Sequence, residues 1–72
     1  MFVITADQRA SRTKPDRVDA TLRLLSPEPL LRAFERTAGD ELQGVADDPV
    51  VALGAVLRLV RDGGWSVGVG VG

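Results

Sequence analysis

Apolar and polar residues follow regular patterns in several separate segments of this chain. The first segment, MFVITAD, is apolar and rich in β-branched residues, and it stops at a polar loop. This pattern predicts a short buried strand with Asp7 at its C-terminal end. The last segment, WSVGVGVG, alternates strictly, with Trp65 and three valines on one face and Ser66 and three glycines on the other. Period-two alternation predicts a final strand there.

A first helix is predicted between these strands. Thr13, followed three residues later by Asp16, resembles a capping box, and SPEP stops the pattern after Leu25. The helix is expected over about Pro15 to Leu25. Its apolar residues at helical spacing are Val18, Leu22 and Leu25.

A second helix is predicted after Asp48, which serves as N-cap, with Pro49 in the first turn and Gly63 as the stop. An apolar stripe along it is expected to cover one face of a sheet. The stripe consists of Val50, Leu53, Leu57 and Val60.

Two extended segments, Leu30 to Thr37 and Leu42 to Ala46, lie between the helices and are separated by AGDE. A short gap that contains glycine predicts a hairpin. Asp40 and Glu41 are therefore expected at the hairpin tip. Asp40 could serve the turn alone, through hydrogen bonds from its side chain to the backbone.

The order strand, helix, strand, strand, helix, strand predicts an α+β fold of the ferredoxin-like βαββαβ type, with a four-stranded antiparallel sheet and two helices on one face. The other face of the sheet is expected to stay open or to pair. The first and third strands are central neighbours in this arrangement. Asp7 is therefore expected to meet Asp40 and Glu41 at one end of the sheet.

Composition narrows the chemistry that this chain can perform. Its 72 residues suffice for one domain, and the formal net charge of −1 gives no general attraction to nucleic acid or acidic membranes. The sequence has no cysteine and no histidine, which excludes disulfides, thiolate or imidazole metal sites and histidine catalysis. No apolar run approaches the roughly 20 residues that span a bilayer. A soluble cytoplasmic protein is expected.

The acids Asp7, Asp40 and Glu41 are candidate ligands for Mg²⁺ or Mn²⁺, because any metal here must be held by oxygen, and the phosphates of a ligand could complete the coordination. The cationic loop QRASRTK follows the first strand. Its candidate phosphate-binding residues are Arg9, Ser11 and Arg12. The alternatives are that the acids only form a turn or an ion pair with Arg9 or Arg12, and that the loop is an ordinary solvated connection.

The motifs ITADQRASR, GDELQG and VGVGVG resemble the N-terminal region of the SatD family of bacterial proteins across the whole chain. The family motif has Gly-Asp-Glu-Phe-Gln-Gly where this chain has Leu42 in place of the aromatic residue. SatD proteins continue past the last strand, so the chain is expected to be an N-terminal fragment made of a single palm-like domain. The matching residues are Asp7, Ser11, Arg12, Gly39, Asp40, Glu41, Gln43 and Gly44.

More remotely, the layout is similar to the palm domains of nucleotidyl and diguanylate cyclases, in which an acid ends the first strand and further acids occupy the central hairpin. This resemblance implies that Asp7 and Asp40 bind metal, that Glu41 assists, and that a nucleoside triphosphate is the ligand. The first functional interpretation is thus a metal-dependent nucleotide-binding module. The alternative is a non-catalytic regulatory or dimerisation domain of the SatD family. A homodimer is expected, with the glycine face of the last strand as one surface that it could bury.

Overall fold

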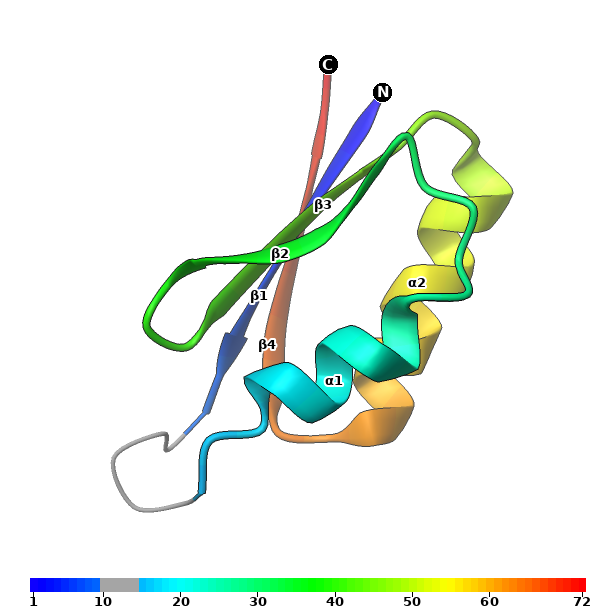
Figure 1. The fold of residues 1–72 in the computed structure, drawn as a ribbon. Coiled ribbons are helices and arrows are strands. Elements are labelled where there is room, and N and C mark those ends of the chain that lie inside the picture. The colour runs from blue at the N-terminus through cyan, green and yellow to red at the C-terminus, as the bar shows by residue number, and fades with distance from the viewer. Residues whose placement is uncertain (10–14) are drawn as a thin grey trace.

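A computed structural model describes residues 1–9 and 15–72 as one sheet with two helices against a single face (Figure 1). The strands are ordered β2-β3-β1-β4, and every neighbouring pair is antiparallel. The predicted α+β class, with its four-stranded antiparallel sheet and two helices, is therefore confirmed. The elements are β1 (Phe2–Gln8), α1 (Val18–Leu25), β2 (Arg32–Ala38), β3 (Glu41–Ala46), α2 (Pro49–Asp62) and β4 (Trp65–Val71).

The helix ends follow from local hydrogen bonds. In α2 the side chain of Asp48 accepts the N–H of Val50 at 2.8 Å, and the chain leaves the helix through Gly63 at φ +79°, as the sequence predicts. The predicted start of α1 at Pro15 is wrong, because the helix begins at Val18, whose N–H is bound by Asp16 at 2.9 Å. Thr13, the expected cap, lies outside the described residues.

The core lies between the helices and the face of the sheet formed by alternate residues of its central strands. Ile4 and Ala6 of β1 are fully buried, as is Leu42 of β3, and Phe34 and Trp65 are core residues as well. Ile4 stands opposite Gly44 and Ala6 opposite Leu42, so both residues pair with positions on the same face of β3. One face of β1 is thus covered and the other stays open.

Asp62, the last residue of α2, ties three elements together. Its carboxylate accepts hydrogen bonds from the hydroxyl of Thr21 at 2.9 Å, from the indole N–H of Trp65 at 2.9 Å and from Arg17 at 2.7 Å. Thr21 is 1% exposed and lies in α1, so its hydroxyl needs a partner inside the protein. A single carboxylate therefore fixes α1, α2 and β4 relative to one another.

The buried face of α2 differs from the predicted one. Its buried residues are Ala52, Ala55 and Leu59. Leu59 is the large residue on this face, with Val51 and Val56 partly buried beside it, and the two alanines are small enough for a close approach of the helix to the sheet. The predicted core stripe is instead exposed: Val50 (75%), Leu53 (58%), Leu57 (43%) and Val60 (61%). These four residues are called the outer stripe below.

In the described part of the chain, neither helix has the length and apolar character needed to cross a membrane. The two chain ends lie side by side where β1 pairs with β4 (Figure 1). The N-terminal ammonium group of Met1 donates to the carbonyl of Gly72 at 2.7 Å, and the N–H of Gly72 donates to the carbonyl of Met1 at 2.9 Å. The β1–β4 ladder thus extends to both ends of the chain.

Gly44 provides a test of the packing under the sheet, because a Cβ placed there would lie 2.9 Å from the ring of Phe34. Such a distance forces the ring or the strand to move. Gly44→Ala is expected to lower the free energy of unfolding by about 1–3 kcal/mol. Urea denaturation monitored by the fluorescence of Trp65 measures this change.

Gly39→Ala is the matched control, because a Cβ there would meet nothing within 4 Å and the residue has no left-handed backbone conformation. It is expected to stay within about 1 kcal/mol of the parent. Equal losses in both variants would contradict the packing of Phe34 over Gly44.

Candidate functional site

Three acidic residues meet where β1 ends beside the β2–β3 hairpin. Asp7 of β1 stands directly opposite Glu41 of β3 in the register. The turn residue Asp40 adjoins them, since its backbone carbonyl accepts the N–H of Gln8 at 3.0 Å. The sequence analysis expected this convergence, and the structure brings the three residues together. Asp7, Asp40 and Glu41 are called the acid end below.

The acids at this end influence one another. Asp7 is exposed, yet partial desolvation, the charges of Glu41 and Asp40 and a hydrogen bond with Glu41 together raise its pKa above the ordinary 3.8. Glu41 is held in turn by the hydroxyl of Thr37, which donates to it from the other strand of the hairpin. The acid end is therefore a place where negative charge is concentrated and where a cation or a proton is favoured.

A shallow pocket of about 360 Å³ adjoins the acid end. Its lining comes from β1, from the segment before α1 and from the hairpin turn, and consists of Gln8, Asp16, Gly39 and Asp40. Only Asp40 belongs to both the acid end and the pocket. The pocket is thus open space that the acid end reaches through Asp40, while the side chains of Asp7 and Glu41 lie on the other face of the sheet.

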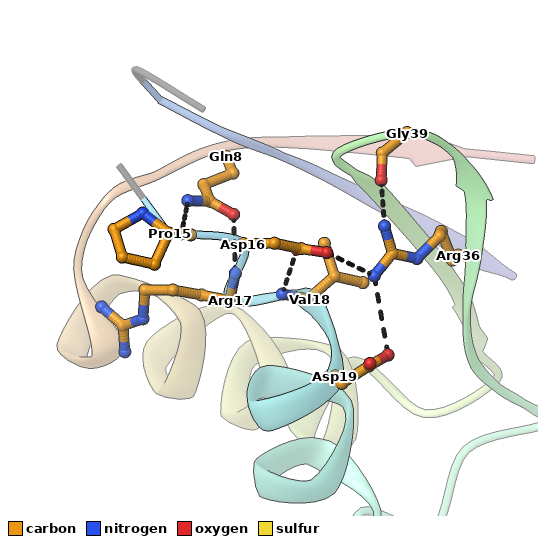
Figure 2. A network of polar contacts seen from close by, with 8 residues as sticks. All are labelled: Gln8, Pro15, Asp16, Arg17, Val18, Asp19, Arg36 and Gly39. Carbon is orange, nitrogen blue, oxygen red and sulfur yellow. Dashed lines mark hydrogen bonds and ion pairs between the residues drawn. The ribbon is translucent and has the colours of Figure 1, made fainter. Parts of the chain in front are cut away.

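A network of polar contacts forms the wall of this pocket (Figure 2). Gln8 is 6% exposed, and its amide donates to the carbonyl of Pro15 at 2.8 Å and accepts the N–H of Arg17 at 3.0 Å. Both hydrogen-bonding groups of the buried amide are thereby used, as burial requires. Gln8 consequently fixes the segment that enters α1 against the end of β1.

Arg36 of β2 closes the other side of the network. Its guanidinium donates to Asp16 at 2.9 Å, lies 3.5 Å from Asp19, and also donates to the carbonyl of Gly39 in the turn (Figure 2). The hydrogen bond from the N–H of Val18 is the main reason that the pKa of Asp16 lies below its ordinary value, and the hydrogen bond from Arg36 lowers this pKa further. Arg36 thus links the hairpin turn to the start of α1.

Gln8, Asp16 and Arg36 belong to the polar network of the candidate site, and the sequence motifs did not predict this. One signal for Gln8 was present, since it continues the buried alternation of Ile4 and Ala6. A polar residue at such a position needs internal partners. No comparable pattern marks Arg36, because its acidic partners lie about twenty residues earlier in the chain.

The predicted phosphate-binding residues fall in two groups. Arg9 follows β1 directly, is exposed, and donates its backbone N–H to the carbonyl of Gly64 at 2.7 Å. Ser11 and Arg12 lie outside the described residues. Within residues 1–9 and 15–72, no group of three or more acidic side chains is arranged as a set of metal ligands.

Comparisons with protein-family models, with curated proteins and with solved structures found no match for this chain. The acid end and its pocket are therefore the observations on which an assignment of function depends.

The raised pKa of Asp7 predicts a particular dependence of stability on pH. The folded protein holds the Asp7 proton to a higher pH than the unfolded chain, so stability falls as pH rises from about 3.8 through the folded pKa. Asp7→Asn is expected to be more stable than the parent above this window. The difference in stability between variant and parent should vanish at a pH below 3.8, the ordinary pKa of an aspartate side chain. Urea denaturation in the presence of chelator across this pH range measures it.

Glu35→Gln is the matched control. Glu35 lies on the same face of the sheet as Asp7, but its neighbour across the strands is Gln43. Its stability relative to the parent should not reproduce the pH dependence of Asp7→Asn. An Asp7→Asn variant less stable than the parent throughout the range would contradict charge repulsion at the acid end.

Proposed function

We propose that this protein binds a nucleotide through its phosphates, with the help of Mg²⁺ or Mn²⁺, at the acid end. The observation that carries this proposal is the juxtaposition of Asp7, Asp40 and Glu41 where β1 meets the hairpin, with Asp40 also lining an open pocket of about 360 Å³. Carboxylate oxygens are the ligands that these hard cations prefer. The proposal concerns binding and makes no claim of turnover.

The arrangement of the strands supports a relation to palm domains. We propose that the order β2-β3-β1-β4, with both helices on one face, is a ferredoxin-like arrangement. In the cyclase palm domains that the sequence resembles, acids at the end of the first strand and in the central hairpin bind metal. Asp7 stands at the first of these positions, and Asp40 and Glu41 at the second. Membership of the SatD family is proposed on the same sequence motifs.

The cation is expected to need a second partner. The described residues supply no ready set of three acidic ligands, and Asp7 already shares a hydrogen bond with Glu41. Phosphate oxygens from a nucleotide would complete the coordination, since Mg²⁺ is commonly held by one or two carboxylates plus substrate phosphates. Metal and nucleotide are therefore expected to bind together more tightly than either binds alone.

The cationic residues after β1 are proposed to contact the phosphates. Arg9 follows β1 directly, two residues after Asp7 in the sequence. Ser11 and Arg12 belong to the same loop in the sequence. Guanidinium groups form strong, charge-assisted hydrogen bonds with phosphate oxygens. The proposal assumes a cytoplasmic location, where nucleoside triphosphates and Mg²⁺ are both present.

A second candidate is a non-catalytic regulatory or dimerisation domain of the SatD family. The exposure of the outer stripe on α2 favours this candidate, because large apolar side chains gathered on one surface indicate an interaction site. The two candidates make different predictions for the acid end. Only the first requires it to respond to metal and nucleotide.

Thermal melting and calorimetry with a panel of nucleoside triphosphates test the first candidate. Metal and nucleotide together are expected to stabilise the parent protein, by about 2.7 kcal/mol at a hundredfold excess over the dissociation constant. Each of Asp7→Asn and Asp40→Asn should abolish most of this shift, because each removes a negative oxygen ligand at nearly constant size.

The quantity compared is the shift that ligand causes in each variant, so that differences in intrinsic stability cancel. Glu35→Gln serves again as the control, since it removes an acid outside the acid end and should respond like the parent. The functional proposal fails if the parent shows no shift with any triphosphate and either metal, or if Asp40→Asn responds like the parent.

A further inference from the structure

The free edge of β4 presents unpaired backbone groups. The N–H of Gly72 and the carbonyl of Gly64 both bond to the β1 side of the sheet, to Met1 and Arg9 respectively. The N–H and C=O groups of successive residues point to alternate sides of a strand. Since the even-numbered residues Gly64 and Gly72 bond toward β1, the odd-numbered residues of β4 point their N–H and C=O groups away from β1. Among the described residues no further strand lies beyond β4. These outward-pointing residues include Val67, Val69 and Val71.

The opposite edge of the sheet is built differently. β2 carries Arg32, Glu35 and Arg36, and its pairing with β3 is interrupted by two register shifts. Charges and bulges are features that keep an edge strand from pairing with another chain. β4 has neither a charged residue nor a proline, and its pairing with β1 is regular from Trp65 to Val71. The edge at β4 is therefore open to strand addition.

Two residues of the outer stripe, Leu53 and Val60, lie toward this same edge, whereas Leu57 lines a groove beside α1 together with Leu24 and Glu28. Gly54 and Arg58 mark the side of α2 that faces α1, because both lie next to Glu28 in the segment after α1. Two residues along a helix correspond to about 200° of rotation. Val60, two residues after Arg58, is thus on the opposite flank, and Leu53 lies within the same flank. α2 packs mainly over β4 and β1 and also contacts β3, whereas α1 packs over β2 and β3.

We propose that the β4 edge and the flank of α2 that carries Leu53 and Val60 form one self-complementary surface that binds a second copy of this chain. Antiparallel pairing of two β4 strands about a two-fold axis perpendicular to the sheet keeps both helix layers on one face. The same operation turns Leu53 and Val60 of each α2 toward the same residues of the copy, as an isologous interface requires. The product is a continuous eight-stranded sheet with an apolar contact between the two α2 helices.

A second copy fits this surface better than a charged partner does. Every residue of β4 and of the outer stripe is uncharged, so the two-fold axis brings no like charges together. Val69 and Val71 of β4 are 49% and 77% exposed on the helix side, where the α2 layer leaves them uncovered. The glycine face, by contrast, shares its side of the sheet with Asp7 and Glu41, and two copies meeting there would oppose these charges.

The size of a stable interface sets the area that this surface must bury. A stable interface of standard size buries about 800 Å² on each partner. The accessible surface of the chain is 4534 Å², and its most exposed large apolar residues include the outer stripe together with Val69 and Val71. This inference does not depend on nucleotide binding, because none of these residues belongs to the acid end.

Analytical ultracentrifugation of the 72-residue chain tests the interface, with a dimer expected at about 100 µM. Leu53→Lys places a charge in the outer stripe and Val69→Lys places one at the β4 edge. Each is expected to raise the dimer dissociation constant at least about tenfold. Leu31→Lys is the matched control, because Leu31 is 55% exposed, close to the 58% of Leu53, but precedes β2 at the other side of the sheet. It should dimerise like the parent.

Hydrogen exchange of the parent gives a second readout that needs no variant. The outward N–H groups of Val67 and Val69 should exchange more slowly as protein concentration rises, whereas the exposed N–H groups of the β2 edge should not change. A monomeric parent at this concentration overturns the proposal. A dimer that both lysine variants retain, or one without concentration-dependent protection in β4, also overturns it. Asp7→Asn should still dimerise, which separates this test from that of nucleotide binding.

Discussion

Ile4, Ala6 and Gln8 all point to the helix side of β1, and the antiparallel register with β3 and β4 holds them there. A shift of one residue would move every side chain of the strand to the other face. Gln8 would then leave its partners before α1, and Asp7 would enter the core as a charged group. The core, the entry into α1 and the acid end therefore all depend on this one register.

Gln8 is the residue at which these three parts of the structure meet. Its backbone N–H bonds to the hairpin turn through Asp40, and its side chain bonds to the segment that precedes α1. The pocket beside the acid end lies between the same elements. The shape of the pocket is thus fixed by backbone and amide hydrogen bonds, while the carboxylates of Asp7 and Glu41 lie on the other face of the sheet.

Much of this arrangement could be predicted from local patterns. The apolar β-branched run located β1, alternation located β4 and its two faces, and the glycine-containing gap located the hairpin that brings Asp40 and Glu41 to Asp7. The buried face of α2 could not be predicted in this way. Periodicity identifies an apolar side by its large residues, but Ala52 and Ala55 face the sheet because close approach of the helix favours small ones. The polar network of Arg36 was hidden for another reason, since its partners are distant in sequence and follow no period.

The ladder between β1 and β4 joins the first residue of the chain to the last. Before it can form, nearly the whole chain must close into a loop, and the conformational entropy lost in closing a loop increases with its length. The β2–β3 hairpin closes over only a few residues and can form on a much faster timescale. The contacts of β4 thus have the greatest sequence separation in the sheet, and contacts of this kind slow the folding of small domains. β4, the strand with the open edge, is consequently the strand that gains its native contacts most slowly during folding.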